Sequence, residues 1–239
     1  MSQGPITLCI DIGGSKTKLV RCDARSLPLE AEPVRKDTPA NAGPEATLEL
    51  VIDALPELAG DFDRIAIGYP GVIRDGICAT AVNLAPAWHG FPIAAAFAER
   101  LGKPARAAND ADVQGLGSIR GKGTELVLTL GTGIGSALFR DGLLIPNCEF
   151  GHLPYGNNSS FERELGKNAL HELGWELWVE RVPPALEVFR RCFNPDLILV
   201  GGGNARFLSR IELAADVVIV PNEAGLYGGV RLWMGGFER

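Results

Sequence analysis

Two glycine-rich segments of the same design, about 120 residues apart, constrain the fold of this chain more than any other feature. One is LCIDIGGSKTKLVRCD and the other is VLTLGTGIGSALFRDG, with Gly13 aligned on Gly133. Each joins an apolar strand to a second strand through a glycine-rich turn and ends in Arg and Asp. Because the offset is close to half the chain, the repeat predicts a duplicated fold of two lobes with a central cleft. Two unrelated hairpins are the alternative.

Apolar and β-branched runs ended by Gly, Pro or Asp alternate with helical patterns along the chain. Strands joined by tight turns occur alongside strands separated by helices, which predicts an α/β class with a mixed sheet. We expect helices over the ranges 44–59, 91–101, 111–120, 161–193 and 223–235, the fourth interrupted at Gly174 and at Pro183-Pro184. The expected lobes are residues 1–108 and 109–239, with the last helix able to pack back on the first lobe.

Net charge and cysteine usage narrow the class of protein. A net charge of −6 and a pI near 5.2 argue against a nucleic-acid partner. The five cysteines are scattered without a C-x-x-C pair, which favours reduced thiols over a disulfide framework or a zinc cluster. No charged and apolar leader precedes the first strand, and no apolar stretch approaches the roughly 20 residues needed to cross a bilayer. We therefore expect a cytoplasmic protein with no membrane partner.

The glycine-rich turns match neither a Walker A loop nor a G-x-G-x-x-G segment that opens a helix, because a strand follows each of them. Glycine in such a turn lets backbone N–H groups approach phosphate oxygens, and Ser15 and Thr132 add hydroxyl donors. Asp11, at the end of the first strand, is a candidate ligand for Mg²⁺, directly or through water. One such turn alone is typical of a plain hairpin. Two of them, with a third glycine segment at Gly201–Gly203, favour nucleotide or polyphosphate binding.

Two further segments carry chemistry. In AANDADVQG, Asp110 stands where a strand gives way to a helix, so it is either an ordinary N-cap or a base that accepts a hydroxyl proton during phosphoryl transfer. In NCEFGHL, Glu149 and His152 are candidates to hydrogen-bond a polyol, although a lone histidine is more often structural. The residues that follow them supply no further zinc ligands.

The ordered set DIGGSKTK, GYPG, NDAD, LGTGIGSALFRDG, EFGH and LVGGG resembles the ROK family of sugar kinases, which have the actin/hexokinase-like (ribonuclease H-like) fold. The resemblance spans nearly the whole chain. Within the family the chain is most similar to the polyphosphate glucokinases, through TLGTGIGSALFRDGLLIPNCEFGHL and GWELWVERV. Like them, it lacks the zinc cluster that follows E-x-G-H in most other members.

The resemblance also implies a role for each matching residue. Asp110 would be the catalytic base for the sugar 6-hydroxyl, and Asp11 would hold Mg²⁺. The phosphate- or nucleotide-binding set would be Asp11, Gly13, Gly14, Ser15, Lys18, Gly131, Thr132, Gly133, Gly201, Gly202 and Gly203. The sugar-binding set would be Asn83, Asn109, Asp110, Glu149, His152 and Glu162. The spacing of Trp175 and Trp178 is typical of core packing on a helix.

We therefore expect a kinase that transfers a terminal phosphoryl group from polyphosphate or ATP to the 6-hydroxyl of glucose, and that forms a homodimer. The family's lysine-rich run after the glycine triplet is replaced here by NARFLSR, with Arg206 and Arg210. Since a long polyanion needs several cations along its path, a strictly ATP-dependent kinase for glucose or another hexose is the first alternative. A sugar-binding protein without catalysis is the second. A sugar-responsive repressor would need a helix-turn-helix domain, whereas here a strand begins by residue 6.

Overall fold

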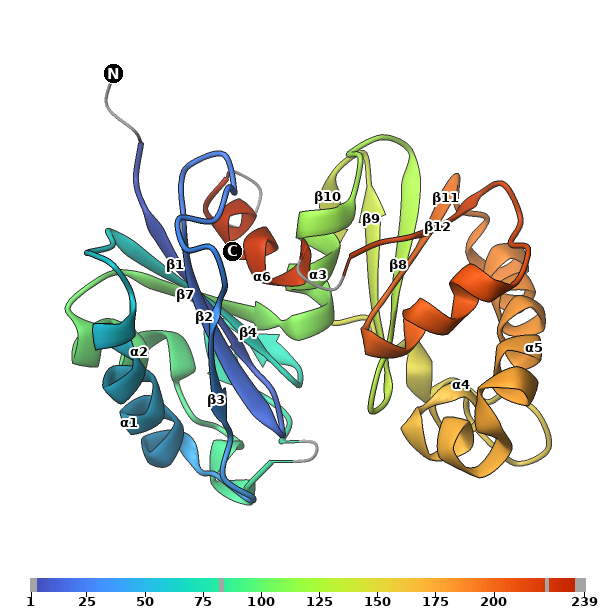
Figure 1. Cartoon of the computed structure of the whole chain (residues 1–239), viewed down its shortest axis with the longest axis horizontal. Helices are drawn as coiled ribbons and strands as arrows, with labels where there is room; N and C mark the ends of the chain where they lie inside the picture. Colours follow the sequence, from blue (N-terminus) through green and yellow to red (C-terminus); the bar gives the residue numbers. More distant parts are fainter. Residues whose placement is uncertain (1–3, 82–83, 222–223, 235–239) are drawn as a thin grey trace. The chain divides into compact units, whose positions relative to one another are not determined.

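A computed structural model describes residues 4–81, 84–221 and 224–234 (Figure 1). The chain divides into two compact units, residues 1–117 with 223–239, and residues 118–222. Each unit is built on its own five-stranded mixed sheet. No helix in the described part of the chain has the length and apolar character needed to span a membrane.

The sheet of the first unit has the strand order β3-β2-β1-β4-β7. Strands β2 and β3 are antiparallel to their neighbours, whereas β1, β4 and β7 run parallel. The strands are β1 Thr7–Ile12, β2 Lys16–Cys22, β3 Val34–Asp37, β4 Arg64–Tyr69 and β7 Ala105–Asn109. A separate small hairpin consists of β5 Ile73–Arg74 and β6 Ile77–Cys78.

The sheet of the second unit repeats this order as β10-β9-β8-β11-β12, with the same pattern of strand directions. Its strands are β8 Thr124–Leu130, β9 Ile134–Arg140, β10 Leu143–Ile145, β11 Leu197–Gly201 and β12 Val217–Ile219. Both glycine-rich segments form the β-hairpin that opens their sheet. The duplication expected from the sequence is therefore confirmed at the level of topology.

Side-chain alternation along β1 and β4 separates the two faces of the first sheet. Leu8, Ile10, Ile65 and Ile67 point to one face and are buried against helices α1 and α2. These helices are α1 Pro44–Ala54, followed by a 3-10 turn Leu55–Glu57, and α2 Ile93–Leu101. Helix α2 ends at Gly102, whose positive φ of 62° is a conformation that glycine adopts without strain.

The opposite face of the first sheet is covered by the C-terminal segment, α6 Ala224–Tyr227 and the 3-10 helix Gly228–Trp233 (Figure 1). Glycine allows this close approach, because a Cβ on Gly229 would lie 2.8 Å from Ala66 Cβ and 3.0 Å from Cys9 Sγ. The segment is helical as expected, although most of it has 3-10 geometry; the ends of the expected 223–235 range lie outside the described residues.

Helix α3, Asp110–Ser118, follows β7 directly and packs against the same C-terminal segment. A Cβ on Gly228 would lie 2.6 Å from the backbone nitrogen of Gly117. Because of this packing, nearly all of α3 belongs to the first unit. The boundary between the two units therefore follows Gly117, whereas the sequence predicted it after residue 108. The last segment is also part of the first unit.

The core of the second unit forms where α4 Phe161–Leu165 and α5 Lys167–Phe193 pack on β8 and β11. Gly174 interrupts α5 with φ 76° and ψ 158°, as the sequence predicted. The interruption expected at Pro183-Pro184 is wrong, because α5 continues through both prolines. The buried neighbours Val182, Ala185 and Leu186 hold this part of the helix on the sheet. The remaining 3-10 segments are Pro86–Trp88, Phe150–His152 and Gly203–Arg210.

Candidate functional site

In the first glycine turn, Asp11 and Lys18 are cross-strand partners of the β1–β2 ladder. Lys18 Nζ lies 2.8 Å from Asp11 Oδ2, and each side chain is about 70% buried, with 28% and 29% exposed. Lys16 pairs instead with Asp37 on β3. The turn itself is closed by a hydrogen bond from the Gly13 N–H to the Lys16 carbonyl at 3.0 Å. Asp11 and Lys18 therefore form one half-buried ion pair at the end of β1.

The second glycine turn is fixed from three sides. The Gly131 N–H donates to the Gly133 carbonyl at 3.0 Å, and the Thr132 carbonyl accepts from the Lys167 N–H at 3.1 Å. Asn204 Nδ2 donates to the Gly131 carbonyl at 3.0 Å. Asn204 was not among the residues expected at the site, although its position directly after the glycine triplet was a usable signal.

The glycine triplet lies beside this turn, because β11 pairs with β8 and Gly201 is the register partner of Thr129. Gly202 has φ 85°, and a Cβ there would lie 2.7 Å from the Leu130 nitrogen. Gly203, by contrast, faces open space. The structure thus brings Gly131–Gly133 and Gly201–Gly203 together at the carboxyl-terminal ends of β8 and β11 in the second sheet.

The carboxylate of Glu162, a residue of α4, contacts the second glycine turn. Glu162 Oε2 accepts a hydrogen bond from the Ile134 N–H at 3.3 Å. A Cβ on Gly133 would lie 2.8 Å from Glu162 Cδ, so only glycine leaves room for this carboxylate. Glu162 was expected in the sugar-binding set, and its contact with the phosphate turn is a feature that the sequence did not indicate.

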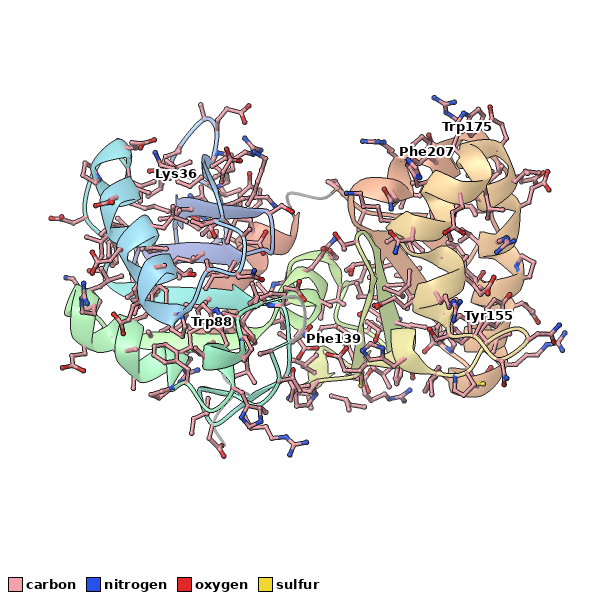
Figure 2. All side chains as sticks on the ribbon, turned by 90° about the horizontal axis from the view of Figure 1, so that it is seen from below. Lys36, Trp88, Phe139, Tyr155, Trp175 and Phe207 are labelled. Carbon is pink, nitrogen blue, oxygen red and sulfur yellow. The ribbon has the colours of Figure 1, made fainter. Side chains whose placement is uncertain are left out.

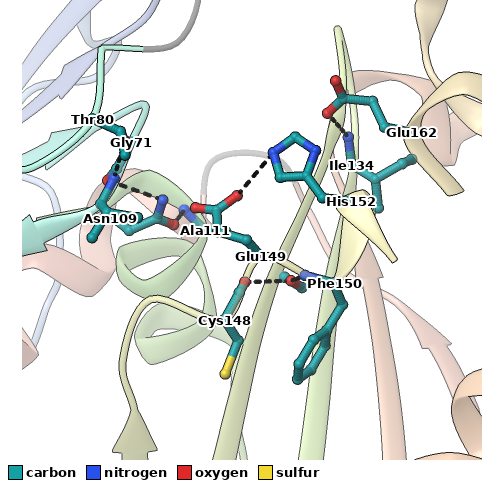
Figure 3. A network of polar contacts seen from close by, with 12 residues as sticks. Gly71, Thr80, Asn109, Ala111, Ile134, Cys148, Glu149, Phe150, His152 and Glu162 are labelled. Carbon is teal, nitrogen blue, oxygen red and sulfur yellow. Dashed lines mark hydrogen bonds and ion pairs between the residues drawn. The ribbon is translucent and has the colours of Figure 1, made fainter. Parts of the chain in front are cut away.

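The segment that carries Glu149 and His152 is shown in Figure 3, and the buried Ser136 of β9 anchors it. Ser136 Oγ donates to the Cys148 carbonyl and accepts from the Phe150 N–H at 2.8 Å. Glu149 Oε2 lies 3.7 Å from His152 Nε2. Burial raises the pKa of the Glu149 carboxyl above its usual value, His152 opposes this rise and the charge of Glu162 adds to it.

The NDAD segment resolves the question of the helix cap. Asn109 Oδ1 accepts from the N–H groups of Ala111 and Asp112 at 2.8 and 3.3 Å, so Asn109 is the N-cap of α3 (Figure 3). Its Nδ2 donates to the Gly71 carbonyl at 3.2 Å. Asp110 is then the first residue of the helix, and its Oδ1 accepts from the Ala111 N–H at 2.7 Å. The interpretation of Asp110 as the N-cap is therefore wrong, and its carboxylate stands at a helix N-terminus, which favours negative charge.

Some expected site residues are not brought together within one unit. Asp11, Asn109 and Asp110 belong to the first unit, whereas both Glu149 and His152 belong to the second, together with the second turn. Asn83 lies outside the described residues. Across the described ranges, no three His, Cys, Asp or Glu side chains gather as ligands for a metal ion.

The two tryptophans of α5 have different environments. Trp178 is fully buried and donates from Nε1 to the Leu165 carbonyl at 3.0 Å, as expected for core packing. Trp175 is only partly buried and lies parallel to Phe207, with ring centroids 6.3 Å apart (Figure 2). The Arg210 guanidinium lies 4.2 Å from the Trp175 ring centroid, and that of Arg206 lies 4.8 Å from the Phe207 centroid.

Comparison with known proteins gives this arrangement a family. The ROK family profile matches residues 7–166. The polyphosphate glucokinase of Mycobacterium tuberculosis (strain CDC 1551 / Oshkosh) is 32% identical over 233 residues, covering 92% of this chain and 88% of that protein. The structure of an inorganic polyphosphate/ATP-glucomannokinase from Arthrobacter sp. strain KM is 33% identical, with a TM-score of 0.85 over 95% of this chain and 97% of that one. The chain belongs to the ROK family.

More distant structures support the same fold. A ROK family glucokinase from Streptomyces griseus, solved in complex with glucose and AMPPNP, has a TM-score of 0.78 at 19% identity, over 95% of this chain and 98% of that one. At this identity the match speaks for the fold alone. The fold is the actin/hexokinase-like one, with the mixed α/β sheets described above.

Proposed function

We propose that this protein is a hexose kinase of the glucokinase type, which transfers a terminal phosphoryl group from polyphosphate or ATP to the 6-hydroxyl of glucose. The observation that carries the proposal is the repeated glycine hairpin, one copy beside Asp11 and the other beside Gly201–Gly203. The similarity to a polyphosphate glucokinase and to a polyphosphate/ATP-glucomannokinase, over more than nine tenths of the chain, supports it.

In this proposal Asp110 is the general base. Its carboxylate takes the proton of the sugar 6-hydroxyl as the oxygen attacks the terminal phosphorus of the donor, and the shortened donor leaves. The reaction has a loose transition state, so most of the rate comes from positioning and from neutralising the phosphate charge. The N–H groups of the two glycine turns and the ammonium of Lys18 supply that neutralisation.

Magnesium fits the residues present at the first turn. Mg²⁺ binds to one or two carboxylates together with phosphates and water, rather than in a cage of protein ligands. Asp11 offers one carboxylate at the end of β1, directly or through water, and the described residues contain no larger ligand cluster. When bound, the ion would offset negative charge on the donor phosphates.

For the sugar, we propose Glu149 and His152 as hydrogen-bonding partners, with Asn83, Asn109, Asp110 and Glu162 completing the set. The anchoring of residues 148–150 by Ser136 supports a rigid sugar segment. Asn109 already uses both ends of its amide within the protein, so its contribution is the placement of Asp110 as well as any contact with the sugar.

The donor is the finer part of the proposal. Arg206 and Arg210 are exposed and stacked on Phe207 and Trp175, which keeps two cations on the 3-10 helix Gly203–Arg210 that follows the glycine triplet. We infer that a polyphosphate chain and ATP both reach this part of the second unit. A homodimer, a cytoplasmic location and the cleft between lobes stay predictions.

A coupled assay of glucose 6-phosphate formation tests the function. The purified protein is given glucose and Mg²⁺ with either ATP or long-chain polyphosphate. Product from both donors, or from polyphosphate alone, supports the proposal as stated, and product from ATP alone favours the strictly ATP-dependent kinase. No product from either donor with glucose, mannose or N-acetylmannosamine, while glucose binding persists in calorimetry, would favour the sugar-binding protein without catalysis.

A further inference from the structure

Near the amino-terminal ends of β4 and β7 in the first sheet, two arginines lie over one aromatic ring. Thr7 and Arg64 open strands β1 and β4 as register partners, and Arg106 on β7 pairs with Ala66. Since Arg64 and Ala66 are two residues apart, Arg64 and Arg106 project from the same face of the sheet. The site residues Asp11 and Asn109 are at the other end of these parallel strands. Along the strands, Arg64 lies about 13 Å before Gly68, the register partner of Asp11, and Arg106 lies about 10 Å before Asn109.

The ring is that of Trp233 in the C-terminal segment. The Arg106 guanidinium carbon lies 4.6 Å from the ring centroid, and that of Arg64 lies 5.2 Å from it. Arg64 Nε donates to Thr7 Oγ1 at 2.8 Å, and Arg106 Nη1 donates to the Leu232 carbonyl at 2.6 Å. Each of these hydrogen bonds uses one N–H, so both planar groups are held in place with most of their donors left over.

Among the described residues, no carboxylate lies within ion-pair distance of these two guanidinium groups. Within the described ranges neither Arg64 nor Arg106 forms an ion pair. Asp63 is adjacent in sequence, but its Oδ2 accepts a hydrogen bond from the Ile6 N–H at 2.7 Å. Burial lowers the pKa of Arg64, and the charge of Arg106 lowers it further, although Cys9 and Asp63 oppose this. Two like charges held together in this way are stabilised by an anion.

A third donor belongs to the same cluster. The indole nitrogen of Trp233 is shielded from solvent and has no hydrogen-bond partner among the described residues. Buried N–H groups of tryptophan usually find an acceptor. A cluster of two guanidinium groups and one indole N–H therefore offers donors without offering acceptors.

We propose that Arg64, Arg106 and Trp233 form a binding site for a tetrahedral oxyanion of the phosphate class, separate from the site of phosphoryl transfer. The planar fork of a guanidinium binds two oxygens of a phosphate at once, and two forks suit a dianion with three or four oxygens. The ligand is either free inorganic phosphate or the phosphate group of a sugar phosphate. The alternative is that the arginines only hold the C-terminal segment on the sheet.

Fluorine NMR of the full chain, labelled with 5-fluorotryptophan, separates these possibilities. The sequence has four tryptophans, and Trp233→Phe assigns the Trp233 signal. Inorganic phosphate is titrated at constant ionic strength against chloride. We expect a saturable shift of the Trp233 signal, with a Kd in the millimolar range, and no shift of the Trp88 and Trp178 signals from the buried cores.

Matched variants then identify the donors. Arg64→Lys and Arg106→Lys keep the charge but lose the fork, and each should weaken binding about tenfold. The same exchange at the exposed Arg74 should leave binding unchanged. Lys18→Met should also leave phosphate binding at this cluster unchanged, because Lys18 lies beside Asp11 at the carboxyl-terminal end of β1. Circular dichroism checks that each variant is folded.

Titration with glucose 6-phosphate distinguishes the two sources of the anion. Tighter binding of the sugar phosphate identifies an organic phosphate as the ligand, whereas tighter binding of inorganic phosphate identifies the free ion, and either supports the site. The proposal is overturned if phosphate causes no saturable shift of the Trp233 signal in the wild-type protein. It is also overturned if a folded protein with both lysine substitutions gives the same shift.

Discussion

Lys18 lies directly across the β1–β2 ladder from Asp11, with its ammonium 2.8 Å from the carboxylate, at the point where the first glycine turn begins. The pair is half-buried, so water screens it less than the exposed pair of Lys16 with Asp37. The two lysines of GGSKTK thus have different environments, although they are only two residues apart. Lys18 pairs with Asp11, which we propose to lie at the donor site, and Lys16 pairs with Asp37 of β3.

The first prediction compares these lysines. Lys18→Met should raise the KM for the phosphoryl donor about tenfold, because it removes a charge-assisted contact to phosphate. Lys16→Met should leave that KM unchanged within about twofold, since an exposed ion pair contributes little. Initial rates at saturating glucose measure both. Equal KM values for the two variants would exclude Lys18 from donor binding.

The second prediction concerns Asp110. Asp110→Asn should lower kcat by roughly 10²–10⁴-fold while leaving glucose affinity nearly unchanged. The amide oxygen can still accept from the Ala111 N–H, so the start of α3 should keep its structure. Steady-state kinetics measures kcat, and calorimetry with glucose measures affinity. A variant with full turnover would remove Asp110 from the role of base.

The third prediction uses the contrast between two glycines of one turn. Gly133→Ala should lower the free energy of unfolding by about 1 kcal/mol, because the new Cβ displaces the Glu162 carboxylate from the Ile134 N–H. Gly131→Ala, where a Cβ meets nothing, should change it by less than about 0.5 kcal/mol. Urea unfolding measures both.

A double variant checks the cause assigned to this difference. When Glu162→Ala is added to Gly133→Ala, the two effects should not be additive, because the first removes the side chain that the second displaces. Additive losses would show that Gly133 is required for a reason other than the Glu162 carboxylate.

The fourth prediction follows from the raised pKa of Glu149. Because the folded protein holds the proton of this carboxyl more tightly than the unfolded chain does, the stability contributed by Glu149 falls as pH rises from 4.5 through the raised value. Glu149→Gln should remove this decline, whereas Glu172→Gln at an exposed position of α5 should not. Thermal unfolding across this pH range measures the slopes. An unchanged slope in Glu149→Gln would contradict the burial of its charge as the cause.

Much of the fold could be predicted because its signals are local. Each glycine hairpin carries its turn and both its strands within about 16 residues, so the repeat indicated two similar sheets before any tertiary contact was known. The break at Gly174 was also local, since glycine readily adopts a positive φ. The break predicted at Pro183-Pro184 is wrong, because the burial of Val182 and Leu186 outweighs the helix hydrogen bonds that the two prolines remove.

Other parts of the site could not be predicted, because they depend on contacts between distant segments. Asn109 and Asp110 are equally good capping residues, and only the geometry of β7 and α3 decides that Asn109 is the cap. The contact of Glu162 with Gly133 joins residues of α4 and of the turn before β9, and no sequence pattern relates them. The same holds for Trp233, which meets two strands far from it in sequence.

The division of the chain has a consequence for its synthesis. The second unit is one continuous stretch, whereas the first uses both ends of the chain. A ribosome builds the chain from its N-terminus, so the second unit is complete while the first still lacks the segment that packs on Cys9 and Ala66. One face of the first sheet therefore stays uncovered until Gly228–Trp233 is available to pack on it. A chain cut before Gly228 would keep every residue of the second unit, whereas the first unit would lack the segment that covers one face of its sheet.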